Sequence, residues 1–513
     1  MSGFADALEG DAEWKRHRLE AMLAYSYTNG IIMGVGTRGG PTEAQEQAQV
    51  QGAVRVTHAP FALLPFHFPE SAFLRATLLS RPFNKLMDRV SRDVDWLVDV
   101  LGATGKADPF TSKLLGILVE SRAVEPMQRI SLGVLRSDYM VHSVEGDERN
   151  LLQVEINTIA SSFGCISTKM TRMMKTVEDA RIYTSREIPD NSAMSGIADG
   201  IATAHKAWIM QQLVSAHSHR PIIVIMVVQP GETNFCDQRL LHFALKETHD
   251  IVCQRATLRE IYQHGHVDGS GGTGQLIFRG CVVSVVYFRA GYSPDDYPTE
   301  DEWQARLLVE KSLAVKCPNI GLHLAGSKKV QQELARANAV ERYLTAKESK
   351  QIRTCFAGLY ALDEQKDVDE LRVKAEANVG GFVLKPQREG GGNNFYSESM
   401  LDSLRQKSLQ ELKAFIMMER IRPPVQDAIF VRNDVVSRAL CISELGIFGV
   451  FVSDANDQQG EGRKEGEGED EEEGEEEMLA NAYVGYLLRV KPASSDEGGV
   501  AAGFAVLGCP CLF

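Results

Sequence analysis

The sequence lacks a hydrophobic segment long enough to cross a membrane. Its longest uninterrupted apolar run, at 222–228, has seven residues, whereas a membrane-spanning helix needs about twenty. The first twenty residues are charged almost from the start and contain no apolar signal-peptide region. We therefore expect neither secretion nor a membrane partner.

Paired cysteines are also absent. Nine cysteines are scattered over 513 residues, an odd number with no C-x-x-C pair. Such a distribution is typical of reduced thiols and predicts a cytoplasmic protein. Cys509 and Cys511 lie close together, but two residues follow the second one, so we interpret this end as a mobile tail rather than a lipidation or metal site.

Basic residues are in short supply, with 55 Lys and Arg against 69 Asp and Glu and a net charge of −14. Much of this charge is local, because 461–477 holds eleven acids and only two bases. We expect no nucleic-acid partner. The Gly-, Glu- and Asp-rich stretch 453–479 is predicted to be a disordered, solvated loop.

Several catalytic motifs are missing. There is no G-x-x-x-x-G-K-[ST] phosphate loop, no H-E-x-x-H or paired Cys/His zinc spacing, and no G-x-S-x-G elbow. A G-x-G-x-x-G match at 34–39 is followed by Gly40 and Pro41 in a helical context. A dinucleotide fold needs a helix directly after the glycines, so we interpret this match as a plain loop.

The composition is that of a globular enzyme, with 44% hydrophobic and 24% charged residues. The length suggests two to four domains. The first 150 residues are predicted to be mainly helical, and one helix face is marked by Leu86, Val90, Val94, Leu97 and Leu101.

Strands and helices alternate from residue 151 onward, which indicates an α/β or α+β protein. The predicted strands are 153–157, 221–228, 281–288, 381–385, 414–421, 441–451 and 481–491. The predicted helices include 302–316 and 328–335. The stretch 221–327, with two strongly apolar strands, has the size of an inserted α/β domain.

Two oxygen-bearing side chains share one face of the strand at 153–157. Alternate residues of a strand point the same way, so Glu155 and Asn157 lie together opposite Val154 and Ile156. A carboxylate and an amide oxygen are suitable ligands for Mg²⁺. A solvated strand face is the alternative explanation of this segment.

A lysine, a glutamate and three glycines follow the strand at 381–385. Glycines let backbone N–H groups close on phosphate oxygens, and Lys385 can neutralise phosphate charge. Glu389, directly before the triplet 390–392, can hold a metal ion that bridges phosphates. A simple turn would not require a lysine and a glutamate at these positions.

Further cations and polar groups follow or lie within other strands. Arg489 and Lys491 share one strand face, and the small residues 498–503 suit a closing loop. Polar clusters at 229–238 and 289–292 follow apolar strands, where ligands of α/β sheets gather. Ordinary surface strands and strand-end turns would look similar.

Nine segments, in order, together resemble the eukaryotic-type glutathione synthetases of the ATP-grasp superfamily. They are LRSDYM (135–140), EINTIASSFG (155–164), ETNFCDQR (232–239), VVYFRAGY (285–292), LAGSKKVQQEL (324–334), FVLKPQREGGGNN (382–394), CISELGIFGV (441–450), LLR-V-K (487–491) and GGVAAG (498–503). The first 120 residues match weakly, although their length suits the family's helical N-terminal part.

The resemblance implies an ATP-grasp main domain with a helical N-terminal part, lid elements and an inserted α/β substrate-binding domain. It implies ATP- and Mg²⁺-dependent joining of γ-glutamylcysteine to glycine through an acyl phosphate, by a homodimer and without a covalent enzyme intermediate. The corresponding divisions of the chain are 1–220, 221–327 and 328–513.

The resemblance also implies roles for individual residues. It implies that Lys385, Glu389 and Arg489 are catalytic and that Glu155, Asn157 and Glu389 bind Mg²⁺. ATP binding falls to Glu155, Lys328, Lys385, Gly390, Gly391, Gly392, Asn394, Tyr396, Met418, Glu419, Glu444, Lys491 and Glu497. Dipeptide, glycine or product binding falls to Arg136, Ile159, Ala160, Ser161, Ser162, Glu232, Asn234, Gln238, Arg289, Tyr292, Arg489, Val500 and Ala501.

Four features depart from the family pattern: the acidic insertion, and Ala160, Ala290 and Glu497 in place of a serine, an acidic residue and an aspartate. None removes a phosphate or metal ligand. A related ligase with another acceptor amine, such as β-alanine, and a nucleotide-binding scaffold without turnover are the alternatives.

Overall fold

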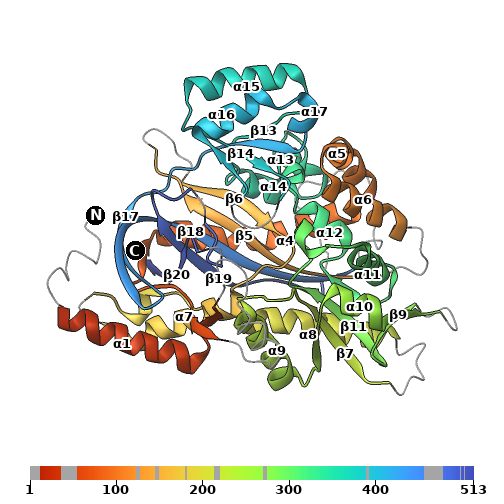
Figure 1. Ribbon diagram of the computed structural model, residues 1–513, viewed down its shortest axis with the longest axis horizontal. Helices are drawn as coiled ribbons and strands as arrows, with labels where there is room; N and C mark the ends of the chain where they lie inside the picture. The colour runs from red at the N-terminus through yellow and green to blue at the C-terminus, as the bar shows by residue number, and fades with distance from the viewer. Residues whose placement is uncertain are drawn as a thin grey trace, which may run out of the picture.

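The computed structural model describes residues 12–35, 55–122, 128–144, 150–179, 182–212, 220–269, 274–388, 392–455, 478–496, 498–501 and 503–513. It contains helices and three larger sheets, and Figure 1 shows the smallest of these three sheets as part of a separate upper layer. Most of the G-x-G-x-x-G match and residues 456–477 of the acidic stretch lie outside the described residues.

A seven-stranded sheet forms the centre of the molecule, and its strands come from distant parts of the chain. Its order is β17-β3-β20-β19-β18-β5-β6, and every pairing is antiparallel except that of β20 with β3. The strands are β3 (Phe61–Ala62), β5 (Ile130–Val141), β6 (Leu151–Asn157), β17 (Gln426–Arg432), β18 (Val435–Asp454), β19 (Ala480–Pro492) and β20 (Val506–Gly508).

Helices cover both faces of this sheet at very close range. On one face, α8 (Ala193–Gln212) brings Gly200 so near the sheet that a Cβ there would lie 2.3 Å from a Val450 methyl group. On the other, α4 (Ser80–Arg92) brings Asn84 to a similar distance from a Cβ built on Gly449. Neighbouring strand residues point to opposite faces, so the sheet lies between α4 and α8.

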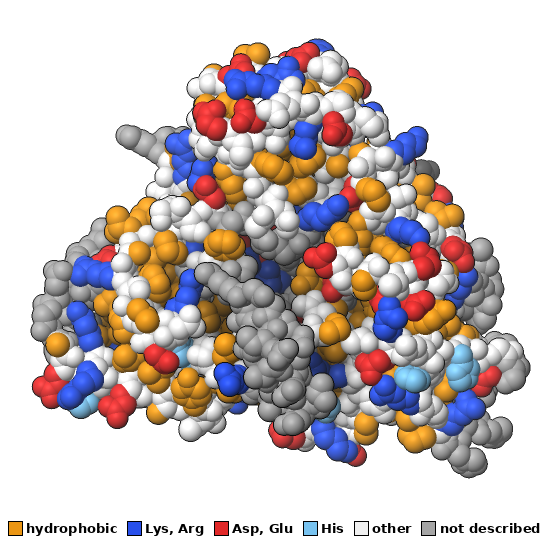
Figure 2. Space-filling model, in the orientation of Figure 1, with side chains coloured by type: hydrophobic (Ala, Val, Ile, Leu, Met, Phe, Trp, Pro, Cys, Tyr) orange, Lys and Arg blue, Asp and Glu red, His pale blue; other side chains and the backbone are white. Residues whose placement is uncertain are grey.

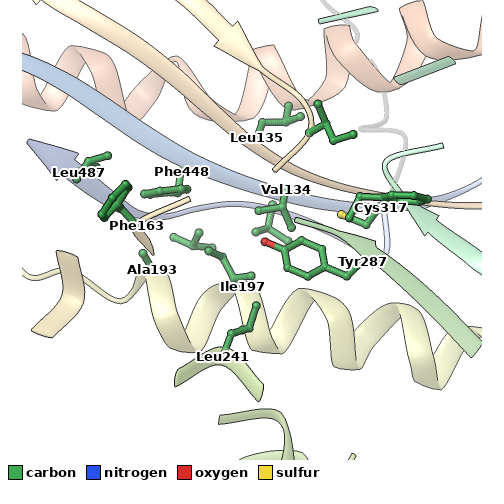
Figure 3. Packing of buried hydrophobic residues seen from close by; sticks show 14 of the residues in the cluster. Val134, Leu135, Phe163, Ala193, Ile197, Leu241, Tyr287, Cys317, Phe448 and Leu487 are labelled. Atoms are coloured by element: carbon green, nitrogen blue, oxygen red, sulfur yellow. The ribbon is translucent and has the colours of Figure 1, made fainter. Parts of the chain in front are cut away.

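A six-stranded sheet lies beside α8 and shares its core with the central sheet. Its order is β8-β7-β11-β10-β9, with β12 paired to β11. Tyr287 of this sheet approaches the core residues Val134 and Ile197 in Figure 3. The strands are β7 (Ile222–Val227), β8 (Cys253–Ala256), β9 (Gly265–Asp268), β10 (Gln275–Phe278), β11 (Cys281–Phe288) and β12 (Val315–Cys317).

The four-stranded sheet of the upper layer has a hydrophobic core of its own, distinct from the main one. Its order is β13-β16-β14-β15. The elements of this unit are β13 (Leu359–Ala361), α15 (Gln365–Ala377), β14 (Phe382–Pro386), β15 (Phe395–Tyr396), α16 (Ser397–Gln406), α17 (Leu409–Leu412) and β16 (Phe415–Glu419). We call it the small unit.

The remaining helices are α1 (Ala12–Asn29), α3 (Glu70–Leu78), α5 (Val94–Ala107), α6 (Pro109–Arg122), α7 (Gly164–Thr176), α9 (Phe235–His249), α10 (Leu258–His264), α11 (Glu300–Lys311), α12 (Ile320–Ala325), α13 (Lys328–Leu334) and α14 (Ala346–Arg353). Two short pairs, β1 (Ile32–Gly34) with β2 (Val56–His58) and β4 (Phe66–Phe68) with β21 (Pro510–Leu512), complete the strands. The 3₁₀ helices are η2 (Ser185–Glu187), η3 (Pro294–Asp296) and η4 (Val340–Arg342).

Two expectations about the elements are wrong. The helix face at 86–101 is divided between α4 and α5, because Asp93 ends the first helix and its side chain accepts the Trp96 N–H at the start of the second. The predicted helix 302–316 ends at Lys311, and β12 follows. The described part of the first 150 residues is mainly helical, as expected, but it also contains the long strand β5.

The C-terminal end is also not a mobile tail. Cys509 and Cys511 are buried, and β21 pairs in parallel with β4. The expected domain boundaries stay a prediction, although the whole six-stranded sheet falls within 221–327. Within the described ranges, no helix is both long and apolar enough to cross a membrane.

Candidate active site

A cavity of about 780 Å³ lies where the central sheet, the six-stranded sheet and the small unit meet. From β5, β6 and the following loop, it is lined by Arg136, Glu155, Asn157, Ile159, Ala160 and Ser162. From the loops after β7 and β11, it is lined by Glu232, Asn234, Arg289 and Tyr292. From α13 and the small unit come Lys328, Lys385, Asn394, Tyr396, Met418 and Glu419, and from β18, β19 and the final loop come Glu444, Arg489, Lys491, Val500 and Ala501.

Some expected site residues are not at this cavity. Ser161 and Gln238 are buried beside it and Gly392 is exposed, and none of the three belongs to its lining. Glu389, Gly390, Gly391 and Glu497 lie outside the described residues. The roles expected for these seven residues stay predictions.

Strand register brings the charged residues together. Glu444 on β18 is paired with Arg489 on β19, and Asp138 on β5 is paired with Glu155 on β6. Because β18 also pairs with β5, with Gly446 opposite Asp138, the four side chains occupy one region of the sheet. Three segments far apart in sequence are thereby joined by backbone hydrogen bonding.

Glu155 is held between lysines. Its carboxylate lies 3.0 Å from Lys328 Nζ, and Lys385 Nζ donates to the Val154 carbonyl at 3.0 Å. Burial opposes the charge of Glu155, but Lys328 and Lys385 outweigh burial and hold its pKa well below the usual range. The carboxylate is therefore ionised at neutral pH.

Arg489 is the centre of a buried ion cluster. Its Nη2 donates to Asp138 at 2.7 Å and also to Glu444. Arg136 donates to the same Asp138 carboxylate, with its Nε 2.7 Å from Oδ1. Burial raises the pKa of Glu444, and Asp138 and Glu155 add to this rise against the opposing effect of Arg489. Arg489 is fixed by carboxylates on two sides.

The wall of the cavity is cationic in an acidic protein. Nine arginines and lysines line it against five carboxylates, as counted among the described residues. On the face shown in Figure 2, acidic and basic side chains are interspersed. The local excess of cations therefore suits small anionic ligands that enter the cavity.

The loop after β6 is held by a buried carboxylate on α9. Asp237 accepts the N–H groups of Phe163, Cys165 and Ile166 at 2.9, 2.9 and 3.1 Å, at the start of α7. It also lies 3.0 Å from Arg289 Nη1. Asp237 thus joins three segments that line the cavity, and it was absent from the expected site residues.

Polar atoms near these loops have no protein partner among the described residues: Asn234 Oδ1, Gln238 Nε2, Arg289 Nε and Arg489 Nε. All four are buried, so each costs free energy unless a ligand or water meets it. The Gln238 amide is oriented by Arg255, whose Nη2 donates to Oε1 at 2.6 Å. Three N–H donors and one oxygen acceptor are therefore available to a small polar ligand.

One part of the cavity is apolar. Val383, Met418 and Ile421 belong to a small hydrophobic cluster with Met140, and all four line the cavity. Glu419, at the end of β16, accepts the Gly358 N–H at 3.2 Å. A slot of this kind accommodates a flat ring with polar edges, such as a nucleotide base.

The loop after β19 touches the small unit. Asp496 accepts from Arg420 Nη2 at 2.6 Å, and its carbonyl accepts from Lys491 Nζ at 2.7 Å and from the Tyr396 hydroxyl at 3.2 Å. Arg420 also lies over the Tyr396 ring, 5.5 Å from its centroid. All four residues line the cavity, so the loop after β19 and the small unit meet at its wall.

Sequence reasoning missed Asp138, Asp237, Arg388 and Arg420. Asp138 stands in the quoted segment LRSDYM, two residues after Arg136, and strand alternation would have placed both on one face. The region was expected to be helical, so that signal was not used. Nothing in the sequence indicated Asp237 as the partner of Arg289.

The residues at β6 fit a hard metal ion. Glu155 is ionised, and Asn157 donates with its amide nitrogen to Asp138 at 3.0 Å, which leaves its amide oxygen as an acceptor. No cluster of three or more His, Cys, Asp or Glu side chains suited to a metal occurs among the described residues. Mg²⁺ bound with nucleotide needs only one or two protein carboxylates in addition to phosphate oxygens and water.

The charged and apolar parts of the cavity suit a nucleotide and small anionic molecules. The family model "Eukaryotic glutathione synthase, ATP binding domain" matches residues 13–512. The chain is 39% identical to a chloroplastic glutathione synthetase of Solanum lycopersicum, over 96% of this chain and 85% of the relative. It is 37% identical to the glutathione synthetases of Dictyostelium discoideum, over 96% of this chain and 98% of the relative, and of Homo sapiens, over 89% and 90%.

The chain therefore belongs to the eukaryotic glutathione synthase family. A solved structure supports the fold alone. It is an apo glutathione synthetase-like effector of Globodera pallida, with a TM-score of 0.72 and 19% identity, covering 97% of this chain and 96% of that one.

Proposed function

We propose that this protein is a glutathione synthase, which joins the cysteine carboxylate of γ-glutamylcysteine to the amine of glycine and converts ATP to ADP and phosphate in the process. The observation that carries the proposal is the convergence of Glu155, Lys328, Lys385, Glu444 and Arg489 on one cavity. Family membership supports the same chemistry.

The chemistry requires activation of a carboxylate, because oxide is not a leaving group. Transfer of the ATP γ-phosphoryl group gives an acyl phosphate, the glycine amine attacks its carbonyl carbon, and phosphate leaves. Lys328 and Lys385 lie where they can bind the phosphates and stabilise the charge that spreads over the transferred group. Mg²⁺, held by Glu155, Asn157 and Glu389, would neutralise phosphate charge when bound.

Arg489 is proposed to stabilise the anionic oxygens of the phosphoryl and tetrahedral species. Its fixed position between Asp138 and Glu444 means that little reorganisation accompanies the reaction. Water would destroy the acyl phosphate, so the site must close during turnover. The Gly390–Gly392 triplet and the loop at 498–501 are the proposed closing segments.

The two ends of the cavity suit different ligands. The slot with Met418 and Ile421 is proposed for the adenine ring. Arg289, Asn234 and neighbouring groups are proposed for the γ-glutamylcysteine end. Val500 and Ala501 leave a compact place for glycine.

ADP release tests the function. The purified protein is given ATP, Mg²⁺ and γ-glutamylcysteine with glycine, with β-alanine or with neither, and the peptide product is identified by mass spectrometry. We expect tripeptide formation and rapid ADP release only with glycine. Preference for β-alanine would assign the related ligase, and equal ADP release in all three samples would reject a glycine ligase.

The metal, the assembly and the compartment are parts of the same proposal. We propose Mg²⁺ as the working ion, a homodimer as the assembly and the cytoplasm as the location. Activity after chelation and Mg²⁺ restoration, light scattering of the eluted protein and imaging of the tagged full chain test the three. Two plant relatives carry the word chloroplastic in their names, which makes the third test a necessary one.

A further inference from the structure

Arg388 lies at the cavity wall, directly before the segment that contains Glu389 and the glycine triplet. A cation in that place has the obvious interpretation of a phosphate ligand. Its contacts give a different picture. Arg388 Nη2 donates to Asp108 Oδ1 at 2.6 Å, and Nη1 donates to the Gln387 carbonyl at 2.6 Å.

Asp108 lies far from Arg388 in sequence, at the corner between α5 and α6. Its side chain is 4% exposed, and its second oxygen accepts the N–H and the hydroxyl of Thr111 at 2.9 and 2.6 Å. Burial opposes its charge, but the hydrogen bonds from Arg388 and Thr111 outweigh burial and lower its pKa. The carboxylate is therefore an ionised and fully engaged partner.

Gln387 is anchored as well. Its side-chain oxygen accepts the Lys329 N–H at 3.1 Å, and its own N–H donates to the Ala414 carbonyl at 3.2 Å. Thr104, on α5, donates to the Lys413 carbonyl at 3.1 Å. The chain before Glu389 is thus tied to α13, to the residue directly before β16 and to the α5–α6 corner.

We propose that Asp108 and Arg388 form an anchor for the cavity-side end of β14 at the proposed nucleotide site, with Arg388 acting as a positioning residue rather than a phosphate ligand. The ion pair fixes the chain that follows β14, the strand that carries the cavity residue Lys385, against the α5–α6 corner. The ion pair thereby holds the small unit, which has its own hydrophobic core, in a fixed position against the helices α5 and α6. The nucleotide as the ligand of this site rests on the proposed function, whereas the contacts of the anchor do not.

The test combines Asp108→Asn, Arg388→Met and the double variant with binding of a non-hydrolysable ATP analogue in Mg²⁺. Each single change should weaken binding about fivefold and lower kcat about tenfold, because a misplacement of roughly 1 Å can cost about a hundredfold and the shift expected here is smaller. The double variant should bind the analogue no more weakly than the single variant with the larger loss, because the effects of substituting two residues in contact are not additive. The KM for γ-glutamylcysteine should stay within twofold of wild type.

Thr111→Val is the matched control, because it removes one bond to the same carboxylate and leaves the Arg388 pair intact. It should lower thermal stability without changing analogue affinity. Weaker binding in Arg388→Met alone, additive effects in the double variant, or no change in either single variant would overturn the anchor.

Arg388→Lys covers the case in which Asp108→Asn does not fold. A lysine keeps the positive charge that a phosphate ligand would need. It does not reproduce the planar guanidinium, which donates to Asp108 and to the Gln387 carbonyl at the same time. We expect affinity to fall as in Arg388→Met, and near-normal affinity would overturn the proposal. Because binding of the analogue needs no turnover, the affinity measurements test the anchor even where the ligase assay fails.

Discussion

At the scale of single residues, the site depends on charges that are buried and mutually compensated. Glu155 gains its low pKa from Lys328 and Lys385, and Arg489 is held by Asp138 and Glu444. A buried charge that loses its partner costs several kcal/mol, whereas an exposed pair contributes little. Substitutions here should therefore affect stability as well as catalysis.

Glu155→Gln should abolish turnover and also change the pH dependence of stability. The folded pKa of Glu155 is depressed, so its stabilising effect is present above the unfolded pKa of about 4.3 and is lost as the pH falls below it. We expect a loss of about 3 kcal/mol in unfolding free energy at pH 7, because Lys328 is left buried without this partner. Urea unfolding at pH 7 and pH 3.5 should show a smaller difference at the lower pH, and an equal difference would contradict the ion-pair explanation.

Asp237→Asn should destabilise the protein by about 3–5 kcal/mol, because it leaves Arg289 buried without its counter-charge and weakens the start of α7. Thermal unfolding measures the change. The control is Asp250→Asn, on the exposed Lys246 pair at the end of the same helix α9, where asparagine also accepts the left-handed backbone. A control as damaging as Asp237→Asn would refute the special position of Asp237.

At the scale of elements, the contacts of Asp496 join the loop after β19 to the small unit. Asp496→Ala should raise the KM for ATP about two- to fivefold, because a partly exposed pair contributes at most about 1 kcal/mol. The KM for γ-glutamylcysteine should not change. Steady-state kinetics check both values, with Glu376→Ala, which breaks the exposed Arg405 pair within the small unit, as a control without effect.

Elements with a simple hydrophobic pattern could be predicted from the sequence, and others could not. The strand at 281–288 was placed to the residue, because an apolar run interrupted only by Ser284 marks a buried strand with parallel neighbours. β5 was missed because it is buried along nearly its whole length, although it carries Arg136 and Asp138. Its sequence therefore lacks the regular alternation of apolar buried and polar exposed residues by which a strand is recognised. Asp93 divides a helical pattern that otherwise continues across it.

The convergence of the site could be predicted only through the resemblance. Arg489 and Asp138 are 351 residues apart and meet because β18 lies between their strands. No local pattern states which strands are neighbours. Residues that act through others, such as Asp237 and Asp108, carry no motif of their own and became visible only in the three-dimensional contacts.

At the scale of the whole molecule, the acidic insertion is attached far from the cavity. β18 and β19 pair up to Val452 opposite Ala480, so the segment leaves and returns at the same point of the sheet. Arg489 is nine residues further along β19, which is about 30 Å at the rise of a strand. At physiological ionic strength, charges are screened over about 8 Å.

Replacing 455–477 by an Asn-Gly turn, which joins Asp454 to Met478 in the register of the two strands, should therefore leave kcat and both substrate KM values within twofold of wild type. Two residues of this type close a hairpin well, and a shorter connection lowers the entropy cost of closure by about 1–2 kcal/mol, so stability should rise slightly. Kinetics at 10 and 150 mM salt check the electrostatic side, since repulsion of ATP by the acidic segment would appear as a lower KM for the deletion at low salt only. A tenfold loss of activity at either salt concentration would contradict a passive insertion and show that this remote part of the chain acts on the cavity.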